Sequence, residues 1–378
     1  MGACRLCGRS SITISDVIGV CSTCLRAGKG VEIALDVHAR LRLGIELVPT
    51  PPRGGKARCR LCVNECEIPE GGLGFCGVWT NRGGKLVPRI GYGKALVHYY
   101  LDPHPTNCVA VPVCPAATGC GYPKYAVRDG TEYGYYNLAV FFAACNLDCL
   151  FCQNWEYKHI VARAEQSRSV IVDIEELVRA AMSSRITCVC YFGGDPTPFA
   201  PYAIEASRRI IEEATKRGQV KRICWETNGL AHPSIMREFA RLSLVSGGIV
   251  KIDWKAWTPE IYTALTGVDG HKALERLKTN TKIVAEMARQ RPEIPLLVVS
   301  TLLVPGYVDA EEVRKIAEYL ASLDIDVPYV LLAFHPDHYL RDLPPTSRRH
   351  AEEALREARR AGLKRVFIGN EWLLGEYY

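Results

Sequence analysis

The sequence of 378 residues is long enough to bury one large core and a smaller module. No apolar run reaches the ~20 residues that a membrane-spanning helix needs, and a net charge of +6 without a long Lys/Arg run argues against a nucleic-acid partner. The N-terminus carries Cys4 and Cys7 where an export signal would need an apolar stretch, so we expect a cytoplasmic protein.

Cysteine is the most informative residue type in this chain. There are 17 cysteines, an odd number, and most of them fall in tight groups within the first 152 residues. In a reducing compartment such groups bind metals more often than they form disulfides. We therefore expect cysteine-rich metal-binding modules ahead of a larger domain.

The first group forms two Cys-x2-Cys pairs within residues 1–30. Two such pairs can close a tetrahedral site of four thiolates, which suits zinc or a rubredoxin-like iron. The alternative is a set of free thiols. The expected ligands are Cys4, Cys7, Cys21 and Cys24.

Residues 31–134 form a second cysteine-rich region, with an expected helix over Val31–Leu47 and a Pro/Gly linker over residues 49–55. Its first cysteines, spaced Cys-x2-Cys-x3-Cys-x9-Cys, are Cys59, Cys62, Cys66 and Cys76. They indicate an auxiliary 4Fe–4S cluster or a zinc site, with unligated thiols as the third alternative. The next cysteines, spaced Cys-x5-Cys-x5-Cys, are Cys108, Cys114 and Cys120. These bind a further cluster, line a substrate entrance or stay unligated.

From residue 135 to residue 378 apolar runs alternate with helical patterns. The runs predict six buried strands at Leu138–Ala143, Thr187–Phe192, Arg222–Trp225, Gly248–Asp253, Leu296–Leu303 and Tyr329–Ala333. The helical patterns lie at Asp173–Met182, Tyr202–Lys216, Ser234–Leu242, His271–Arg289, Asp309–Leu323 and Arg349–Ala361. This alternation predicts an α/β fold with a parallel sheet. Because a closed barrel of this kind needs eight strands, we expect a partial (β/α)6 TIM-like barrel.

Three cysteines directly after the first of these strands carry the functional prediction. Cys145, Cys149 and Cys152 are spaced Cys-x3-Cys-x2-Cys. Thiolates are the usual ligands of a four-iron cluster, and three of them leave one iron open to an outside chelator. This spacing, with the aromatic Phe151 before the last cysteine, resembles the signature of the radical S-adenosylmethionine (SAM) superfamily. The resemblance implies a 4Fe–4S cluster that binds SAM and cleaves it reductively to a 5′-deoxyadenosyl radical.

The resemblance extends from Phe141 to Asn370. It is to the glycyl-radical (pyruvate formate-lyase) activating branch and its relatives, including the radical SAM protein of the AmmeMemoRadiSam system. The segments that carry it are Cys152-Gln153-Asn154, Gly193-Gly194-Asp195-Pro196, Glu226-Thr227-Asn228-Gly229, Asp253-Trp254-Lys255 and Phe334-His335-Pro336.

Each segment implies a role at the cofactor. The backbone of Gly193, Gly194 and Asp195 would bind the methionine amino group, although Asp195 stands where the family usually has Glu. A monovalent cation beside the SAM carboxylate would be bordered by Glu226, Thr227, Asn228 and Asp253. Lys255 would approach SAM, Phe151 would lie near the adenine, and His335 would face the cofactor.

The remaining cysteines, Cys188, Cys190 and Cys224, lie inside predicted strands, where buried structural thiols are expected. The motifs specify SAM cleavage and leave the substrate open. We expect activase-like hydrogen abstraction from a partner protein or another substrate, with ferredoxin or flavodoxin as electron donor. The alternatives are radical modification of a small molecule or RNA with auxiliary N-terminal clusters, and a non-enzymatic zinc-binding adaptor.

Overall fold

The computed structural model describes residues 1–378 and is built around a nine-stranded sheet of order β15-β14-β13-β12-β11-β10-β8-β7-β9. The parallel strands are β8 (Tyr136–Phe142), β10 (Ile186–Gly193), β11 (Arg222–Thr227), β12 (Val250–Asp253), β13 (Leu297–Leu303), β14 (Tyr329–Ala333) and β15 (Val366–Gly369). At one edge β7 (Lys94–Pro103) pairs antiparallel with β8, and β9 (Ile171–Asp173) pairs antiparallel with β7. Because β15 and β9 do not pair with each other, the barrel is open.

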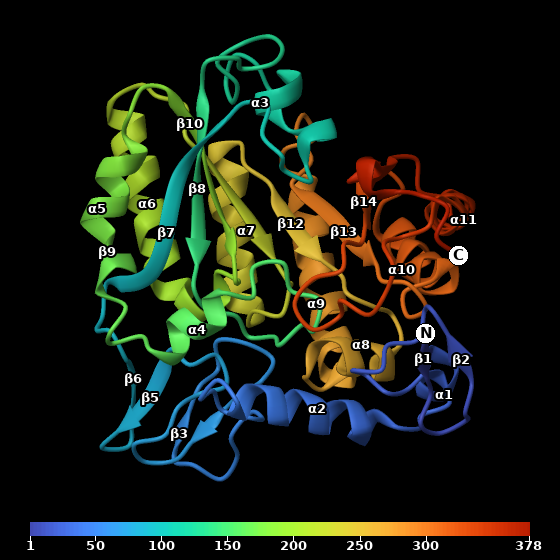
Figure 1. Ribbon diagram of the computed structural model, residues 1–378. Helices are drawn as coiled ribbons and strands as arrows, with labels where there is room; N and C mark the ends of the chain where they lie inside the picture. Colours follow the sequence, from blue (N-terminus) through green and yellow to red (C-terminus); the bar gives the residue numbers. More distant parts are fainter.

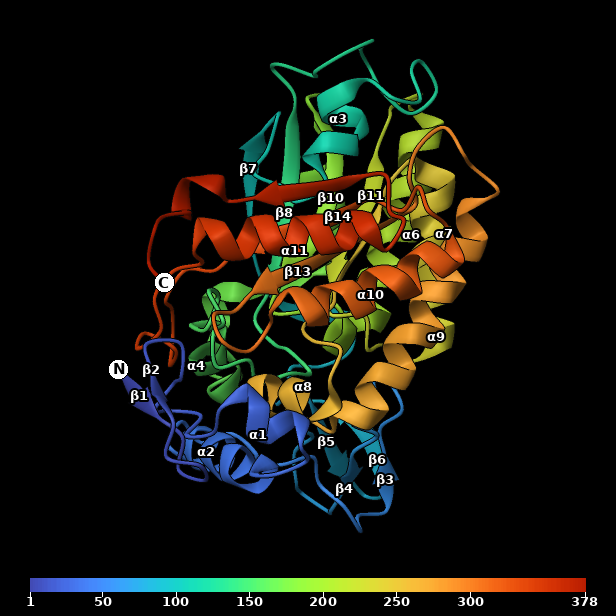
Figure 2. The ribbon, with the colours of Figure 1, turned by 90° about the vertical axis from the view of Figure 1, so that its right-hand side faces the viewer.

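Helices cover the outer face of this sheet, as Figures 1 and 2 show. They are α5 (Ile174–Ala181), α6 (Ala200–Lys216), α7 (Pro233–Ser246), α9 (Gly270–Ala288), α10 (Ala310–Leu323) and α11 (Arg348–Arg360). Between sheet and helices the core is packed with aromatic rings, for example Trp225, whose ring centroid lies 3.9 Å from that of Phe239. No helix of the structure is both long and apolar enough to span a bilayer.

The predicted fold class is confirmed, and each of the six predicted strands and six predicted helices of the barrel is present. The sequence missed β7, β9, β15, α4 (Tyr157–Ala162) and α8 (Pro259–Thr266). β7 was missed because it lies inside residues 31–134, which were expected to be cysteine-rich and irregular. Its pairing with β8 places residues 94–103 in the sheet of the core, ahead of the expected boundary at residue 135.

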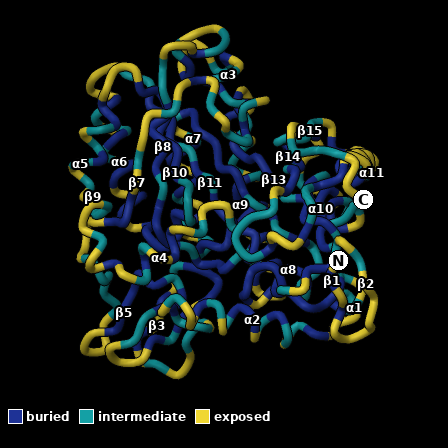
Figure 3. Tube along the Cα trace, in the orientation of Figure 1, coloured by how far each residue is buried: buried dark blue, intermediate teal, exposed yellow.

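The N-terminal residues run along one end of the barrel, across the bottom of Figure 1. They form β1 (Gly2–Ala3), β2 (Ser10–Ser11), α1 (Ser22–Arg26), α2 (Val31–Leu43), β3 (Ala57–Arg58), β4 (Glu67–Ile68), β5 (Trp79–Arg82) and β6 (Lys85–Pro88). The expected helix from Val31 thus ends at Leu43, before Gly44. Figure 3 shows that buried residues continue from the barrel into this region, so the N-terminal segments share its core.

At the opposite end, residues 104–134 and the short helix α3 (Pro115–Thr118) cover the barrel. This plug is tied to the sheet by the Glu132 carboxylate, whose Oε2 lies 2.6 Å from Nη2 of Arg222 on β11. Both side chains are fully buried, and Thr187 on β10 donates a hydrogen bond to the same carboxylate at 2.6 Å. Burial opposes ionisation of Glu132, but the hydrogen bond and charge of Arg222 lower its pKa below the usual value.

We predict that Glu132→Ala lowers the free energy of unfolding by about 3–5 kcal/mol, since removing one partner leaves the other charge buried and unpaired. Urea denaturation followed by circular dichroism measures this change. Glu213→Ala, which removes the partner of the half-exposed Arg217, is the matched control and should leave the midpoint unchanged. Equal midpoints for the two variants would contradict the assigned role of Glu132.

Candidate active site

The first loop of the candidate site follows β8 and carries Cys145, Cys149 and Cys152. These thiols are half-buried and line one cavity of about 280 Å³ at the carboxyl ends of the strands. N–H groups are directed at the sulfur of Cys145, from Leu147 N at 3.4 Å and from Asn228 Nδ2 at 3.7 Å. Such hydrogen bonds are among the interactions that tune iron–sulfur clusters. The donor set therefore fits a 4Fe–4S cluster held by three thiolates.

Two lysines favour the thiolate forms that bind iron. Burial raises the pKa of Cys149 to about 12, and the nearby charge of Lys255 opposes this rise. At Cys152 burial also raises the pKa, and Lys158 opposes it. Since ligation requires deprotonated sulfur, these cations stabilise the state that a cluster needs. The ammonium of Lys255 also lies 5.8 Å from the ring centroid of Phe151.

The loop between the first two cysteines is fixed by Asp148, a carboxylate that is almost fully buried. Its oxygens lie 2.7 Å from Nζ of Lys158, 2.8 Å from Nδ1 of His38 and 3.2 Å from Nη1 of Arg42. Burial alone would raise the pKa of Asp148, but the hydrogen bond from His38 and the charges of Lys158 and Arg42 hold it well below its usual range. Helix α2 of the N-terminal region is therefore part of the support of the cluster loop.

The end of β10 passes close to the cluster loop, and two glycines make this approach possible. Gly193 has φ +98°, and a Cβ there would lie 2.8 Å from Cα of Phe141. A Cβ on Gly194 would collide with the carbonyl oxygen of Ala144. Both glycines line the cavity, so only backbone is presented to a ligand at this position, as the resemblance implies.

The buried side chain of Asp195 connects the end of β10 to the end of β11. Its carboxylate accepts hydrogen bonds from the backbone N–H of Thr197 at 2.8 Å and of Asn228 at 2.7 Å, and from the Thr227 hydroxyl at 3.0 Å. Thr227 therefore supports the loop instead of lining the cavity. The shorter Asp side chain, in place of the usual Glu, has a structural use here because it ties the end of β10 to that of β11.

Acidic and basic side chains alternate at the ends of β11 and β12. Lys251 Nζ lies 2.9 Å from Glu226 Oε2 and 2.8 Å from Asp253 Oδ1, and Lys255 Nζ lies 3.4 Å from Asp253 Oδ2. Burial would raise the pKa of Asp253, but Lys251 and Lys255 hold it well below its usual range. The position between Glu226 and Asp253, where the resemblance implies a monovalent cation, is thus taken by the ammonium of Lys251.

The structure does not bring every predicted residue to the cavity. The side chain of His335 is 49% exposed, pairs with Asp337 at 2.9 Å and does not line the cavity. No residue of the loop directly after β14 lines this cavity, so a role of His335 at the cofactor stays a prediction. Lining residues that were not predicted from the sequence are Asn107, Val109, Leu147, Tyr157, Phe192, Lys251, Leu302, Leu332 and Asn370. For Lys251 a signal existed, because it lies two residues before Asp253 on a strand and shares its face.

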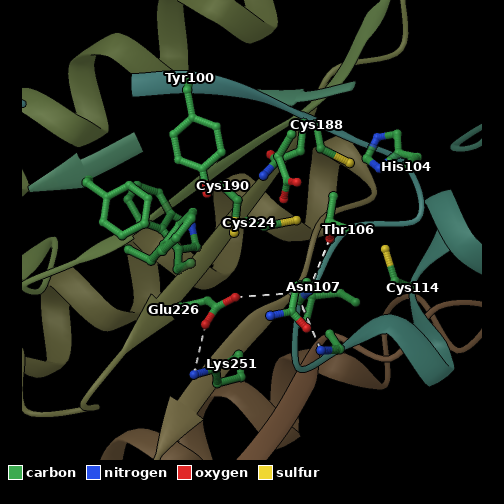
Figure 4. A pocket seen from close by; sticks show the side chains of 18 of the residues that line it. Tyr100, His104, Thr106, Asn107, Cys114, Cys188, Cys190, Cys224, Glu226 and Lys251 are labelled. Atoms are coloured by element: carbon green, nitrogen blue, oxygen red, sulfur yellow. Dashed lines mark hydrogen bonds and ion pairs between the residues drawn. The ribbon is translucent and has the colours of Figure 1, made fainter. Parts of the chain in front are cut away.

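A second cavity, of about 290 Å³, lies inside the barrel and is drawn in Figure 4. It shares Asn107, Gln153, Asn154, Phe192, Glu226 and Lys251 with the first cavity. The strand cysteines were expected to be structural, yet Cys188, Cys190 and Cys224 line this cavity. Cys108 and Cys114 also line it, whereas the third member of their predicted set, Cys120, does not and donates to the carbonyl of Val113 at 3.4 Å.

The cysteines of residues 1–30 meet at a single point. The sulfur–sulfur distance is 3.8 Å for Cys4 and Cys24 and also 3.8 Å for Cys7 and Cys21, and all four sulfurs lie within 4.8 Å of one another. A tetrahedral site with metal–sulfur bonds of about 2.3 Å has edges of about 3.8 Å. The geometry fits one zinc or iron ion, so the predicted metal site is confirmed as an arrangement of ligands.

The second group of four cysteines also converges. Cys59, Cys62, Cys66 and Cys76 line a small cavity whose wall includes Asn146 of the cluster loop. The segment is docked by backbone pairing, since Val63 N donates to Leu230 O at 3.0 Å. The side chain of Asn64 donates to the carbonyl of Asn146 at 2.8 Å. This cysteine group is therefore attached directly to the loop that carries Cys145.

Comparison with known proteins gives a family match for part of the chain. Residues 139–311 match the model of the Radical SAM superfamily. The matched segment runs from β8 to the start of α10, and it is similar to a radical SAM domain, in agreement with the cysteine loop and the cavity described above.

The individual proteins to which this chain is similar share at most about a quarter of their residues with it. An uncharacterized protein of Methanocaldococcus jannaschii is 26% identical over 83% of this chain and 81% of its own length. The GTP 3′,8-cyclase of Clostridium acetobutylicum is 24% identical over 50% of this chain and 53% of its own. Among solved structures, a domain of pyruvate-formate lyase-activating enzyme from Bacteroides vulgatus is 22% identical, covering 48% of this chain and 98% of that chain with a TM-score of 0.37. SuiB of Streptococcus suis bound to S-adenosylmethionine is 14% identical, covering 59% of this chain and 47% of that chain with a TM-score of 0.38.

We predict that Asp148→Asn lowers the free energy of unfolding by about 3–5 kcal/mol, because it leaves the cations from α2 and α4 without their buried counter-charge. Iron retained after anaerobic gel filtration should fall in parallel. Asp36→Asn is the matched control, since Asp36 forms an exposed pair with Arg40 on α2. Unchanged stability and iron content in Asp148→Asn would show that the loop does not depend on this carboxylate.

We also predict that SAM cleavage by the wild type is the same in sodium, potassium and choline buffers, because Lys251 supplies the charge between Glu226 and Asp253. Lys251→Met should make both SAM binding and cleavage depend on sodium or potassium, with a loss of about tenfold or more in choline, since the two carboxylates then lack a counter-charge. Lys272→Met on the surface of α9 is the control. A wild type that itself needs sodium or potassium would refute this assignment.

Proposed function

We propose that this chain generates a 5′-deoxyadenosyl radical from SAM and uses it to abstract hydrogen from a substrate group held beside the SAM cavity. The observation that carries the proposal is the adjoining pair of cavities, which share Phe192, Glu226 and Lys251. A radical made in the first cavity would have a chamber next to it that can hold a substrate group away from water. The bound cluster and SAM supply the radical chemistry, and the protein supplies position and shelter.

The residues of the first cavity have distinct parts in this proposal. Cys145, Cys149 and Cys152 hold the cluster. The backbone at Gly193 and Gly194 binds the amino end of SAM, where no side chain intervenes. Lys255 and the pair formed by Lys251 and Asp253 orient the carboxylate of SAM, and Phe151 borders the adenine. Asn228, hydrogen bonded to the sulfur of Cys145, positions the cluster.

We further propose that the group of Cys59, Cys62, Cys66 and Cys76 holds an auxiliary 4Fe–4S cluster. Four converging thiols give the complete ligand set of such a cluster. The contact of Asn64 with Asn146 places this group beside the cluster loop, which suits a route for electrons from a reduced ferredoxin or flavodoxin. A reducing cytoplasm would keep all of these thiols available for metal.

For the substrate we propose a partner protein, from which the enzyme abstracts hydrogen as an activase does. A second candidate, a small molecule, is favoured by the size and position of the inner chamber, about 290 Å³ within the barrel. One experiment distinguishes a protein substrate from a small-molecule substrate. Electron paramagnetic resonance after SAM and reductant are added to a native cell extract should reveal a protein-bound radical in the first case, whereas deoxyadenosine without a partner radical favours the second.

We predict that Cys149→Ala abolishes formation of 5′-deoxyadenosine, because it removes a ligand of the cluster that cleaves SAM. Cys7→Ala should retain cleavage per folded molecule and lower the melting temperature, because it opens the metal site that ties residues 1–30 together. Product is measured by chromatography under anaerobic conditions. Complete loss of activity in Cys7→Ala without a change in melting would overturn the structural role of that site.

A further inference from the structure

The inner chamber of the barrel has an unusual lining, because five of its side chains are thiols. They are Cys108, Cys114, Cys188, Cys190 and Cys224. Figure 4 labels Cys114, Cys188, Cys190 and Cys224 among them. The register of the sheet places Cys190 directly beside Cys224, and Cys188 follows the same face of β10 one side-chain period away. Cys108 and Cys114 come from the plug, more than sixty residues earlier in the chain.

These thiols are not explained as ordinary core residues. A buried cysteine usually behaves as a small hydrophobe that packs against apolar neighbours. Here the sulfurs line a cavity whose wall also contains His104, Asn137, Glu226 and Lys251. All five are free thiols, so they do not form disulfides across the chamber. A cavity lined by several thiols together with polar and charged side chains suits a thiophilic cofactor.

One cation beside the chamber is placed to stabilise a ligated sulfur. The guanidinium of Arg222 donates from Nε to Sγ of Cys188 at 3.0 Å. The thiol of Cys108 donates to Oε1 of Glu226 at 3.4 Å, a contact that favours the protonated thiol, and Glu226 also borders the SAM cavity. Hydrogen bonds from N–H groups to ligating sulfurs are a common means of stabilising and tuning an iron–sulfur cluster.

From these observations we infer that the thiols of the inner chamber hold an iron–sulfur cluster of their own, separate from the SAM cluster and from the group beginning at Cys59. The plug contributes Cys108 and Cys114, and the strands contribute the others. Along β10 the distance from Cys188 to Phe192, which borders both cavities, is about 13 Å for four residues. The cluster would therefore lie at the inner end of the chamber, within reach of a substrate group placed next to SAM.

The same geometry explains why the spacing of Cys108, Cys114 and Cys120 is not a complete motif. Cys120 does not line the chamber and donates to the carbonyl of Val113. The missing ligands come from β10 and β11 instead. The plug therefore closes the barrel and, in this account, completes a metal site at the same time.

The test is iron and sulfide content of the anaerobically reconstituted full chain, compared among the wild type, Cys190→Ala/Cys224→Ala and the control Cys120→Ala. The double variant should lose about four irons per chain, whereas Cys120→Ala should lose none. The shift of the SAM-cluster signal on addition of SAM should remain in both. Melting temperatures, and the milder Cys190→Ser and Cys224→Ser variants, separate loss of a cluster from misfolding.

Two results would overturn the inference. One is an iron content in the folded double variant that equals that of Cys120→Ala, which would leave the chamber as a substrate pocket lined by unligated thiols. The other is zinc in place of iron at this site in protein purified without oxygen. Because SAM cleavage is measured separately in the same samples, failure of this inference does not depend on whether the proposed function holds.

Discussion

The buried carboxylate of Asp148 is the interaction on which the candidate site depends most. It lies between two of the cysteines that would hold the cluster, and its neighbours are Arg42 and His38 of α2 and Lys158 of α4. The charges of Arg42 and Lys158 and the hydrogen bond with His38 can offset the cost of burying a carboxylate only while all of them are in place. The cluster loop is thereby held in one conformation by a helix that lies more than a hundred residues earlier in the sequence.

This constraint changes how the N-terminal third of the chain is understood. Residues 1–30 are attached to the barrel through Arg26 and Asp309, at 2.8 Å, and through the hydroxyl of Tyr307, which donates to Val20 O at 3.0 Å. The next segment reaches the cluster loop through Asn64, and the plug reaches β11 through Glu132. The cysteine-rich regions therefore form part of the walls and supports of the barrel, and their metal sites would stabilise the catalytic core as well as themselves.

The sequence predicted the barrel well because strands buried on both faces form nearly continuous apolar runs. Such a run could be recognised for each of the six predicted strands. Site residues at the strand ends, such as Gly194 and Asp253, could be found because their motifs are local. What the sequence could not supply was contact between distant segments. The pairing of Asp148 with His38, and the meeting of Cys114 with Cys188 in one chamber, follow no local spacing rule. Lys251 was overlooked although its position two residues before Asp253 placed it on the same strand face. For His335 the motif gave no information on the direction of the side chain, which is 49% exposed in the structure.

The most direct test of the account is a single-turnover experiment on anaerobically reconstituted wild-type protein with SAM and dithionite. The account predicts a reduced-cluster signal in electron paramagnetic resonance that changes when SAM is added, followed by 5′-deoxyadenosine and methionine in amounts that approach the concentration of the enzyme. A protein that binds iron yet gives no change with SAM and no deoxyadenosine would contradict the central claim, and would leave a barrel whose cysteines serve structure alone.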